Sequence, residues 1–232
     1  MSRVAALIAL TALGGCAATA EGPPRFATGI GADRDVTIPI RTFEDTQFSG
    51  VVRQRYDFSC GSAALATLLR YHYDYDVAED LAFRGMWARG DQNAIRRVGF
   101  SLLDMKRWLA SRGLVADGYK VPLDTVAKTG VPGIALITVK QYKHFVVVKG
   151  IRGDEVLLGD PSTGVTVMSR AEFQAAWNGI YFVLANDQPL ARTRFNAATH
   201  WASYTRAPVG SRFTDAVSFD TLSMTAPYFG DL

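Results

Sequence analysis

The sequence predicts an α+β domain in which helices come first and a small antiparallel sheet follows. Apolar residues recur at helical spacing in the segments 59–73 and 101–113, whereas β-branched and apolar runs broken by Gly, Asp and Pro follow residue 132. The chain has 232 residues, of which 48% are hydrophobic and 20% are charged, so it has enough apolar material for one ordinary domain with a packed core.

The two predicted N-terminal helices differ in their signals. In the helix 59–73, one apolar stripe at i, i+3, i+4 and i+7 consists of Leu65, Leu68, Leu69 and His72. The helix 101–113 begins with Ser101 and Asp104, which have the spacing of a capping box, and Gly113 is a suitable stop. Both helices should pack an apolar face on the sheet.

The predicted sheet is built from short runs rich in Val, Ile, Leu and aromatic residues. The expected strands are 134–139, 144–149, 156–158, 166–168 and 181–184. A short helix at 170–177, with Ser169 as its cap, interrupts them.

The N-terminus has the features of a signal peptide, which we assign to residues 1–15. Arg3 supplies a positive charge, and the apolar run 4–13 is too short to cross a hydrocarbon core of about 30 Å. The Leu-Gly-Gly-Cys sequence at 13–16 resembles a bacterial lipobox, so lipidation of Cys16 is predicted. Ordinary signal cleavage near the Ala-Thr-Ala run at 18–20 is the alternative.

Composition divides the remaining chain into three segments. Residues 16–47 are rich in small residues, Pro and Asp, as is typical of a tether. The folded domain is expected at 48–187. Residues 188–232 show no clear period and are expected to form a C-terminal extension that is wrapped on the domain or disordered.

Cys60 is the candidate nucleophile. The chain has two cysteines, so lipidation or removal of Cys16 leaves Cys60 as a lone thiol in a compartment that favours disulfides. A cysteine in the first turn of a helix is exposed to the positive end of the helix dipole, which favours the thiolate. The Gln54 amide and the Cys60 N–H can together form an oxyanion hole. The alternative is a cysteine that only packs the helix start.

His144 and Asp160 are predicted to supply a base and the carboxylate that orients it. They flank the turn sequence 152–154 in a predicted hairpin. If Gly150 pairs with Asp154, His144 lies directly opposite Asp160, with Cβ atoms about 5 Å apart. A register shift of two residues keeps them on one face, and a shift of one separates them. In this arrangement histidine takes the thiol proton and aspartate fixes its tautomer.

Other functional classes have little support. The net charge of +3 comes without a concentrated basic stripe, which argues against nucleic-acid binding. Three scattered histidines and one usable cysteine form no metal-binding pattern, and no Gly-rich phosphate loop is present, so no cofactor is predicted. His72 is expected to be structural, and His200 is expected to have no chemical role.

Together, these motifs resemble the C39 peptidases, papain-like enzymes known for cutting bacteriocin leaders after a Gly-Gly pair. The likeness extends over residues 50–185. It includes the spacing from Gln54 to the Cys60-Gly61 pair, the Pro-Gly-Ile-Ala run at 132–135 and His144 with the apolar strand after it. It also includes Leu-Gly-Asp-Pro at 158–161 and the motifs between 168 and 179.

The resemblance implies a papain-like fold in which N-terminal helices pack on a small antiparallel sheet. It also implies that Cys60 is the nucleophile, His144 the base, Asp160 its orienter and Gln54 the oxyanion donor. One departure is Ser59, because the family often has Asp before the catalytic cysteine. A second is that the best-known members are fused to a membrane transporter, whereas this chain is expected to be a stand-alone exported member. Specificity for Gly-Gly is therefore an open possibility.

The expected function is that of an exported cysteine peptidase, which cleaves a secreted or envelope protein or peptide through a thioester. The expected location is the bacterial periplasm, with a lipid anchor to the outer membrane through Cys16, and a secretion or surface-fibre assembly apparatus is the candidate partner. Two alternatives use the same fold. One is a catalytically silent peptide-binding or assembly module, and the other is an acyl transferase or amidase.

Overall fold

The computed structural model describes residues 42–202 and residue 204. The predicted signal peptide, Cys16, most of the tether and residues 205–232 lie outside the described residues. The helices are α1 (Phe43–Gln47), α2 (Cys60–His72), α3 (Glu79–Trp87), α4 (Gln92–Val98), α5 (Leu102–Ala110), α6 (Leu123–Thr129), α7 (Arg170–Ala176), α8 (Gln188–Arg194) and α9 (Ala198–Ala202). The strands are β1 (Ala116–Lys120), β2 (Gly133–Val139), β3 (Tyr142–Arg152), β4 (Glu155–Asp160), β5 (Gly164–Ser169) and β6 (Trp177–Leu184).

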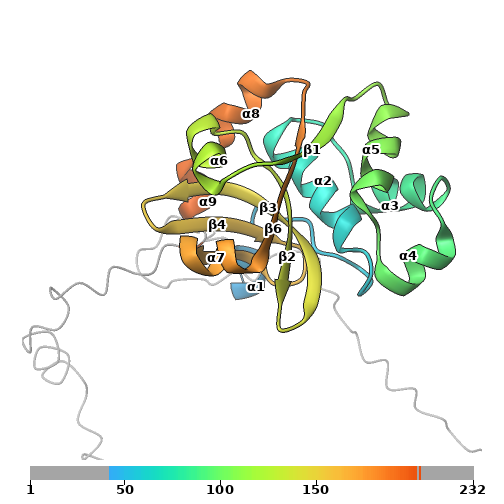
Figure 1. Cartoon of the computed structure of the whole chain (residues 1–232), viewed down its shortest axis with the longest axis horizontal. Coiled ribbons are helices and arrows are strands. Elements are labelled where there is room, and N and C mark those ends of the chain that lie inside the picture. The colour runs from blue at the N-terminus through green and yellow to red at the C-terminus, as the bar shows by residue number, and fades with distance from the viewer. Residues whose placement is uncertain (1–41, 203, 205–232) are drawn as a thin grey trace, which may run out of the picture. The chain divides into compact units, whose positions relative to one another are not determined.

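One antiparallel sheet organises the domain, with the strand order β1-β6-β2-β3-β4-β5. Helices α2, α3 and α5 pack with one face of the sheet in a single hydrophobic cluster (Figure 1). Buried residues of α6 and α7 belong to a second cluster with the other face. The predicted α+β class, with helices packed on an antiparallel sheet, is confirmed.

Helix α2 is the central helix, and all of its residues except Arg70 and Tyr71 are buried. Three alanines without exposed surface, Ala63, Ala64 and Ala66, let the helix axis lie close to its neighbours. Its predicted apolar stripe includes His72, which is fully buried with its ring 4.9 Å from that of His200. Burial lowers the pKa of His72 well below its usual value, so the imidazole is a neutral core group.

The predicted helix starts at Ser101 and Ser169 agree with the structure, although α5 ends at Ala110, before the expected stop at Gly113. Ser101 and Asp104 form a reciprocal capping box at the start of α5. Ser169 and Glu172 do the same for α7. Side chains that satisfy the first N–H groups of a helix are local signals, which explains why these boundaries could be placed from sequence.

Several elements were not predicted. Strand β1 is an edge strand with one buried residue, so it lacks the apolar alternation that indicates a strand. Helices α3, α4 and α6 are short, and α1 lies within the predicted tether. In the C-terminal extension, α8 and α9 form an ordered part of the domain. No helix in the part of the chain that the structure describes is long and apolar enough to cross a bilayer.

Candidate active site

Cys60 is the first residue of α2 and is buried, with 7% of its surface exposed. The first backbone hydrogen bond of the helix runs from Ala63 N–H to Ser59 O (3.2 Å), so the N–H groups of Cys60 and Gly61 precede the helical ladder. Gly61 is required by packing, because a Cβ there would lie 2.9 Å from Cβ of Phe100. The helix start is therefore fixed while its backbone donors stay near the sulfur.

His144 and Asp160 are brought together by β3 and β4. Nε2 of His144 lies 3.0 Å from Oδ2 of Asp160, and both side chains are close to nine-tenths buried. Nδ1 of His144 is also buried and has no hydrogen-bond partner among the described residues. One ring nitrogen is thus held by a carboxylate, and the other remains able to take a proton.

The register that aligns these two residues differs from the expected one. Near the turn, Arg152 pairs with Glu155 and Gly150 with Leu157; beyond a bulge, Val148 pairs with Leu158 and Val147 with Gly159. The expected pairing of Gly150 with Asp154 is therefore wrong, and His144 is not directly opposite Asp160.

Lys149 is the extra residue of this bulge, since it lies between two β3 residues that pair with consecutive residues of β4. Continued without a bulge, the turn-side register would set Val147 opposite Asp160 and put His144 on the other face of the sheet. The extra residue of the bulge shifts the in-and-out alternation of the β3 side chains by one position. As a result, His144 and Asp160 are diagonal neighbours on one face, close enough for a hydrogen bond.

The second carboxylate oxygen of Asp160 is held as firmly as the first. Oδ1 accepts hydrogen bonds from the backbone N–H (2.8 Å) and the hydroxyl (2.6 Å) of Ser162. Burial acts to raise the pKa of Asp160, but the hydrogen bonds from His144 and Ser162 outweigh it and hold the pKa at about 2. Asp160 is therefore an ionised carboxylate at neutral pH. Ser162 was not predicted, although an Asp-Pro-Ser sequence is typical of a turn in which Asp bonds to the backbone two residues on.

Two opposing effects set the protonation of Cys60. Burial raises the pKa of the thiol, and the negative charge of Asp160 adds to this, while hydrogen bonds from the backbone N–H groups of Phe145 and Gly61 lower it. The net direction is upward, so burial outweighs the N-terminal donors that the sequence argument considered. The contact with Phe145 also places the sulfur beside the residue that follows His144.

Gln54 lies next to the end of β4, because its backbone N–H donates to Pro161 O at 3.0 Å. Its side-chain amide donates to Tyr56 O at 3.2 Å. A primary amide has a second N–H, which this bond leaves available. The structure thus holds Gln54 beside the Asp160 segment with its amide engaged in the loop before α2.

A buried carboxylate that sequence reasoning missed supports this loop. Glu79, the first residue of α3, is 5% exposed. Its Oε1 accepts from the hydroxyl of Ser59 (2.7 Å) and from the N–H of Arg55 (3.4 Å). Because Ser59 is a donor here, it is complementary to Glu79, whereas Asp at this position would repel it. In sequence, Glu79 looks like any acidic residue at a helix start.

Tyr142 is a second residue that was not predicted. It is half exposed, its ring lies 5.6 Å from that of His144, and its hydroxyl donates to Asp57 O at 2.8 Å. Partial burial raises the pKa of its hydroxyl, so it stays protonated and can keep this bond. Tyr142 therefore links the strand that carries His144 to the loop that precedes Cys60.

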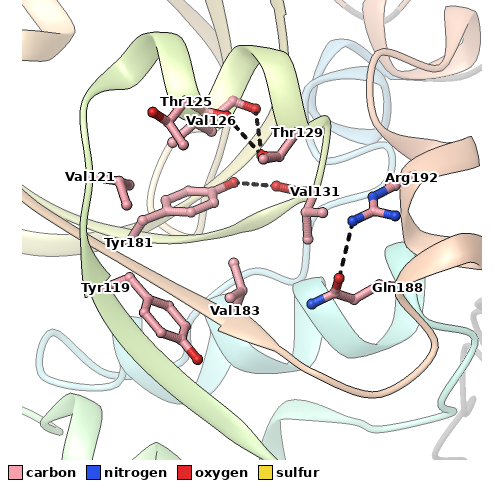
Figure 2. Close-up of a pocket in the computed structure, with 10 residues that line it drawn as sticks. All are labelled: Tyr119, Val121, Thr125, Val126, Thr129, Val131, Tyr181, Val183, Gln188 and Arg192. Atoms are coloured by element: carbon pink, nitrogen blue, oxygen red, sulfur yellow. Dashed lines mark hydrogen bonds between the residues drawn. The ribbon is translucent and has the colours of Figure 1, made fainter.

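A pocket lies elsewhere in the domain (Figure 2). Its volume is about 170 Å³, and its lining comes from β1, α6, β6, α8 and the segments beside α6, with Tyr119 and Tyr181 on one side and Gln188 and Arg192 on another. No candidate catalytic residue lines it. Within residues 42–202 and 204, no group of three or more His, Cys, Asp or Glu side chains could hold a metal ion. The Cys60, His144 and Asp160 cluster is thus the arrangement with recognisable chemistry.

Comparison with known proteins identifies the family of the chain. The model of the Peptidase C39 family matches residues 49–188. The chain belongs to the Peptidase C39 family. This is a family of cysteine-type peptidases with a papain-like fold, and the C39 domain includes every candidate catalytic residue.

Two curated relatives are both called "Probable functional amyloid protease FapD". The protein from Pseudomonas fluorescens is 43% identical over 148 residues, covering 64% of this chain and 66% of that protein. The one from Pseudomonas aeruginosa is 39% identical over 145 residues, covering 62% and 64%. The match therefore spans just under two thirds of each relative's length.

Among solved structures, the peptidase domain of Streptococcus ComA, a bi-functional ABC transporter involved in quorum sensing, is 25% identical. The alignment covers 58% of this chain and 96% of that domain, with a TM-score of 0.49.

Proposed function

We propose that the chain is an exported cysteine peptidase with Cys60 as nucleophile, His144 as general base, Asp160 as the orienting carboxylate and Gln54 as an oxyanion donor. The single observation that carries the proposal is the hydrogen bond of 3.0 Å between His144 and Asp160, which leaves Nδ1 of His144 without a partner among the described residues, while the backbone of the next residue, Phe145, bonds to the Cys60 thiol. This arrangement matches the base and orienter of a catalytic triad.

The reaction would proceed by acyl transfer. Nδ1 of His144 takes the thiol proton as the sulfur of Cys60 attacks the carbonyl carbon of the scissile peptide. The oxyanion that forms accepts hydrogen bonds from Cys60 N–H and from the Gln54 amide. The C–N bond then breaks as the imidazolium gives its proton to the leaving amine. Water attacks the thioester, His144 takes a proton from this water, and the carboxylic acid and the thiol are released.

The raised pKa of Cys60 supports general-base catalysis over a resting ion pair. A buried thiol is mostly protonated at neutral pH, so His144 has to remove the proton during the attack. Asp160, which is ionised with a pKa of about 2, stabilises the imidazolium that results. The negative charge of Asp160 thus assists the base even though it disfavours a resting thiolate.

The names of the relatives suggest the substrate class. Both are described as functional amyloid proteases, so we place this chain with a system that assembles surface fibres from secreted protein. We further propose that the chain acts in the periplasm, is anchored to the outer membrane by a lipid on Cys16, and works beside a secretion apparatus. Cleavage after Gly-Gly is the specificity to test first.

The deciding experiment compares the N- and C-termini of envelope and secreted proteins, by mass spectrometry, in cells with the wild-type chain and cells with Cys60→Ala. Termini that disappear with Cys60→Ala would support proteolysis, and their sequences would identify the cleavage site. Identical termini, with both proteins folded and equally abundant, would refute the peptidase and favour a binding module or acyl transfer. Labelling with a fatty-acid analogue in wild-type and Cys16→Ser cells tests the lipid anchor separately.

A further inference from the structure

The turn-side end of β3 extends past its neighbour β2. The β2–β3 pairing ends with Gly133 opposite Val148, so the next residues of β3 have no strand partner on that edge. A residue from outside the sheet takes the place of the missing strand. Asn196 donates its backbone N–H to Lys149 O (3.0 Å) and its side-chain amide to Ile151 O (3.0 Å). Two buried carbonyls of one strand edge are thus satisfied by one residue.

This contact lies on the bulge that sets the face of His144. Lys149 is the extra residue of the bulge, and Ile151 follows the first pair on its turn side, Gly150 with Leu157. Asn196 therefore spans the bulge. Its backbone N–H holds the carbonyl of Lys149, and its side-chain amide holds the carbonyl of Ile151. A bulge disrupts the local ladder, so bonds from outside the sheet replace support that the ladder does not give at this position.

The backbone of both partners is adapted to the contact. Asn196 has a φ of +59°, which is a left-handed conformation that asparagine adopts more readily than most residues. A Cβ at Gly150 would overlap Oδ1 of Asn196 and lie 3.1 Å from its Cα. On the far side, Nη2 of Arg152 donates to Asn196 O at 2.7 Å.

The segment that carries Asn196 is held independently of its side chain. Phe195 and Ala191 are buried, and Nη2 of Arg194 lies 2.8 Å from Oδ2 of Asp74. Loss of the Asn196 side-chain amide should therefore release Ile151 O and loosen the bulge without detaching α8, although the backbone bond from Asn196 to Lys149 O can remain. Asn196 also lies beyond residues 49–188, which the family model matches.

We propose that Asn196 is a positioning residue of this peptidase: by clamping the bulge at Lys149, it keeps His144 on the same face of the sheet as Asp160. The inference rests on the proposed function, because it assigns a role through the general base. It gives the C-terminal extension a part in catalysis, although Asn196 itself contacts none of the candidate reacting atoms.

The test uses the full chain with graded variants. Asn196→Gly keeps the left-handed backbone and removes only the side-chain donor. Asn196→Asp keeps the size of the side chain but places a carboxylate oxygen against Ile151 O. Gly150→Ala pushes on Asn196 from the strand side. The matched control is Asn186→Gly, which removes a side-chain hydrogen bond of 2.7 Å to Val115 N–H, away from the bulge.

Steady-state kinetics on the substrate found by terminus mapping separate positioning from binding. We expect Asn196→Gly, Asn196→Asp and Gly150→Ala to lower kcat by about 10- to 100-fold with KM changed less than about twofold, because a small misplacement of a catalytic group has effects of this size. Asn186→Gly should lower the thermal unfolding temperature by about as much as Asn196→Gly does, because each variant loses one side-chain hydrogen bond, and it should leave kcat unchanged.

Alkylation gives a readout that needs no peptidase activity. The rate at which iodoacetamide modifies Cys60 is followed against pH by peptide mass spectrometry, since the sulfur attacks as its proton is removed and His144 is the base that removes it. Asn196→Gly should slow modification at neutral pH about tenfold, and Asn186→Gly should not. Wild-type kcat and wild-type alkylation in any folded Asn196 or Gly150 variant would overturn the inference. A wild-type chain that cleaves nothing would refute the proposed function instead, and the alkylation profiles would still decide the role of Asn196.

Discussion

Replacing Asp160 with Asn tests whether both oxygens of this carboxylate are needed. In the structure, Oδ2 accepts from His144 and Oδ1 accepts from the backbone and hydroxyl of Ser162. An amide has one acceptor oxygen, so it can satisfy His144 or Ser162 but not both. If the NH₂ group faces His144, the imidazole loses the tautomer in which Nδ1 accepts the thiol proton. If it faces Ser162, two N–H donors oppose each other, and the chain is pushed away.

The structure gives the size of the stability effect. The pKa of Asp160 is about 2 in the folded chain, compared with the ordinary aspartate pKa of 3.8, which represents the unfolded chain. The difference of roughly 1.8 pH units corresponds to about 2 kcal/mol of stability at neutral pH. Because the folded pKa is the lower one, this contribution is present above the unfolded pKa and is lost as the pH falls through the folded pKa. The wild type should therefore lose about 2 kcal/mol between pH 5 and pH 2 through this group, and Asp160→Asn should not.

The assay combines kinetics with urea unfolding at several pH values. We expect Asp160→Asn to lower kcat by about 10²- to 10⁴-fold and to leave residual activity, because His144 remains but is poorly oriented. Asp154→Asn is the matched control, since it neutralises an exposed carboxylate in the turn of the same hairpin. Wild-type kcat in Asp160→Asn would remove Asp160 from the mechanism. Equal acid sensitivity of both proteins would refute the electrostatic argument.

Three further predictions follow from other parts of the structure. Glu79→Ala should lower the free energy of unfolding in urea by about 1–3 kcal/mol and also lower kcat, because the buried hydroxyl of Ser59 loses its acceptor. An unchanged kcat would make Glu79 purely structural. The β2–β3 turn has two non-glycine residues at positive φ, Lys140 (+48°) and Gln141 (+68°). The double change Lys140→Asn with Gln141→Gly should therefore raise the free energy of unfolding by about 1 kcal/mol. No gain would show that the turn is unstrained. Lys149 is fully buried, and burial lowers its pKa from 10.5 to about 7. Because the unfolded chain binds this proton more tightly, the free energy of unfolding should rise by about 3 kcal/mol from pH 7 to pH 10. Lys149→Met should abolish that rise, and a rise that persists in the variant would assign it to another group.

The parts of the fold that could be predicted from sequence are those with strong local signals. The periodic apolar stripe of α2 and the capping boxes of α5 and α7 were found because neighbouring residues define them. Strand β1 was missed because its stability comes from pairing with β6 rather than from its own apolar residues. Family membership was predictable because Gln54, Cys60, His144 and Asp160 lie in short motifs that resemble those of the family.

The candidate site shows the limit of local reasoning more sharply. The sequence predicted that His144 and Asp160 would lie on one face, and they do, but through a bulge and a different register. Nothing in the run Val-Val-Val-Lys-Gly-Ile at 146–151 specifies an extra residue at Lys149. At the bulge, Asn196 bonds to Lys149 O and Ile151 O, and Nζ of Lys149 donates to Gly50 O (2.6 Å), so the groups that contact it come from distant parts of the chain.

The chain order of the catalytic groups has a consequence for when the enzyme becomes active. His144 and Asp160 are 16 residues apart in one hairpin, so local contacts can bring them together early in folding. Cys60 joins them only when α2 docks on the sheet, which closes a much longer loop. Asn196 lies further along the chain, and its contacts with β3 form only when the segment after α8 docks. A partly folded chain would therefore carry the base without its nucleophile, or both without the clamp, and it could not cut the proteins around it before its own fold is complete.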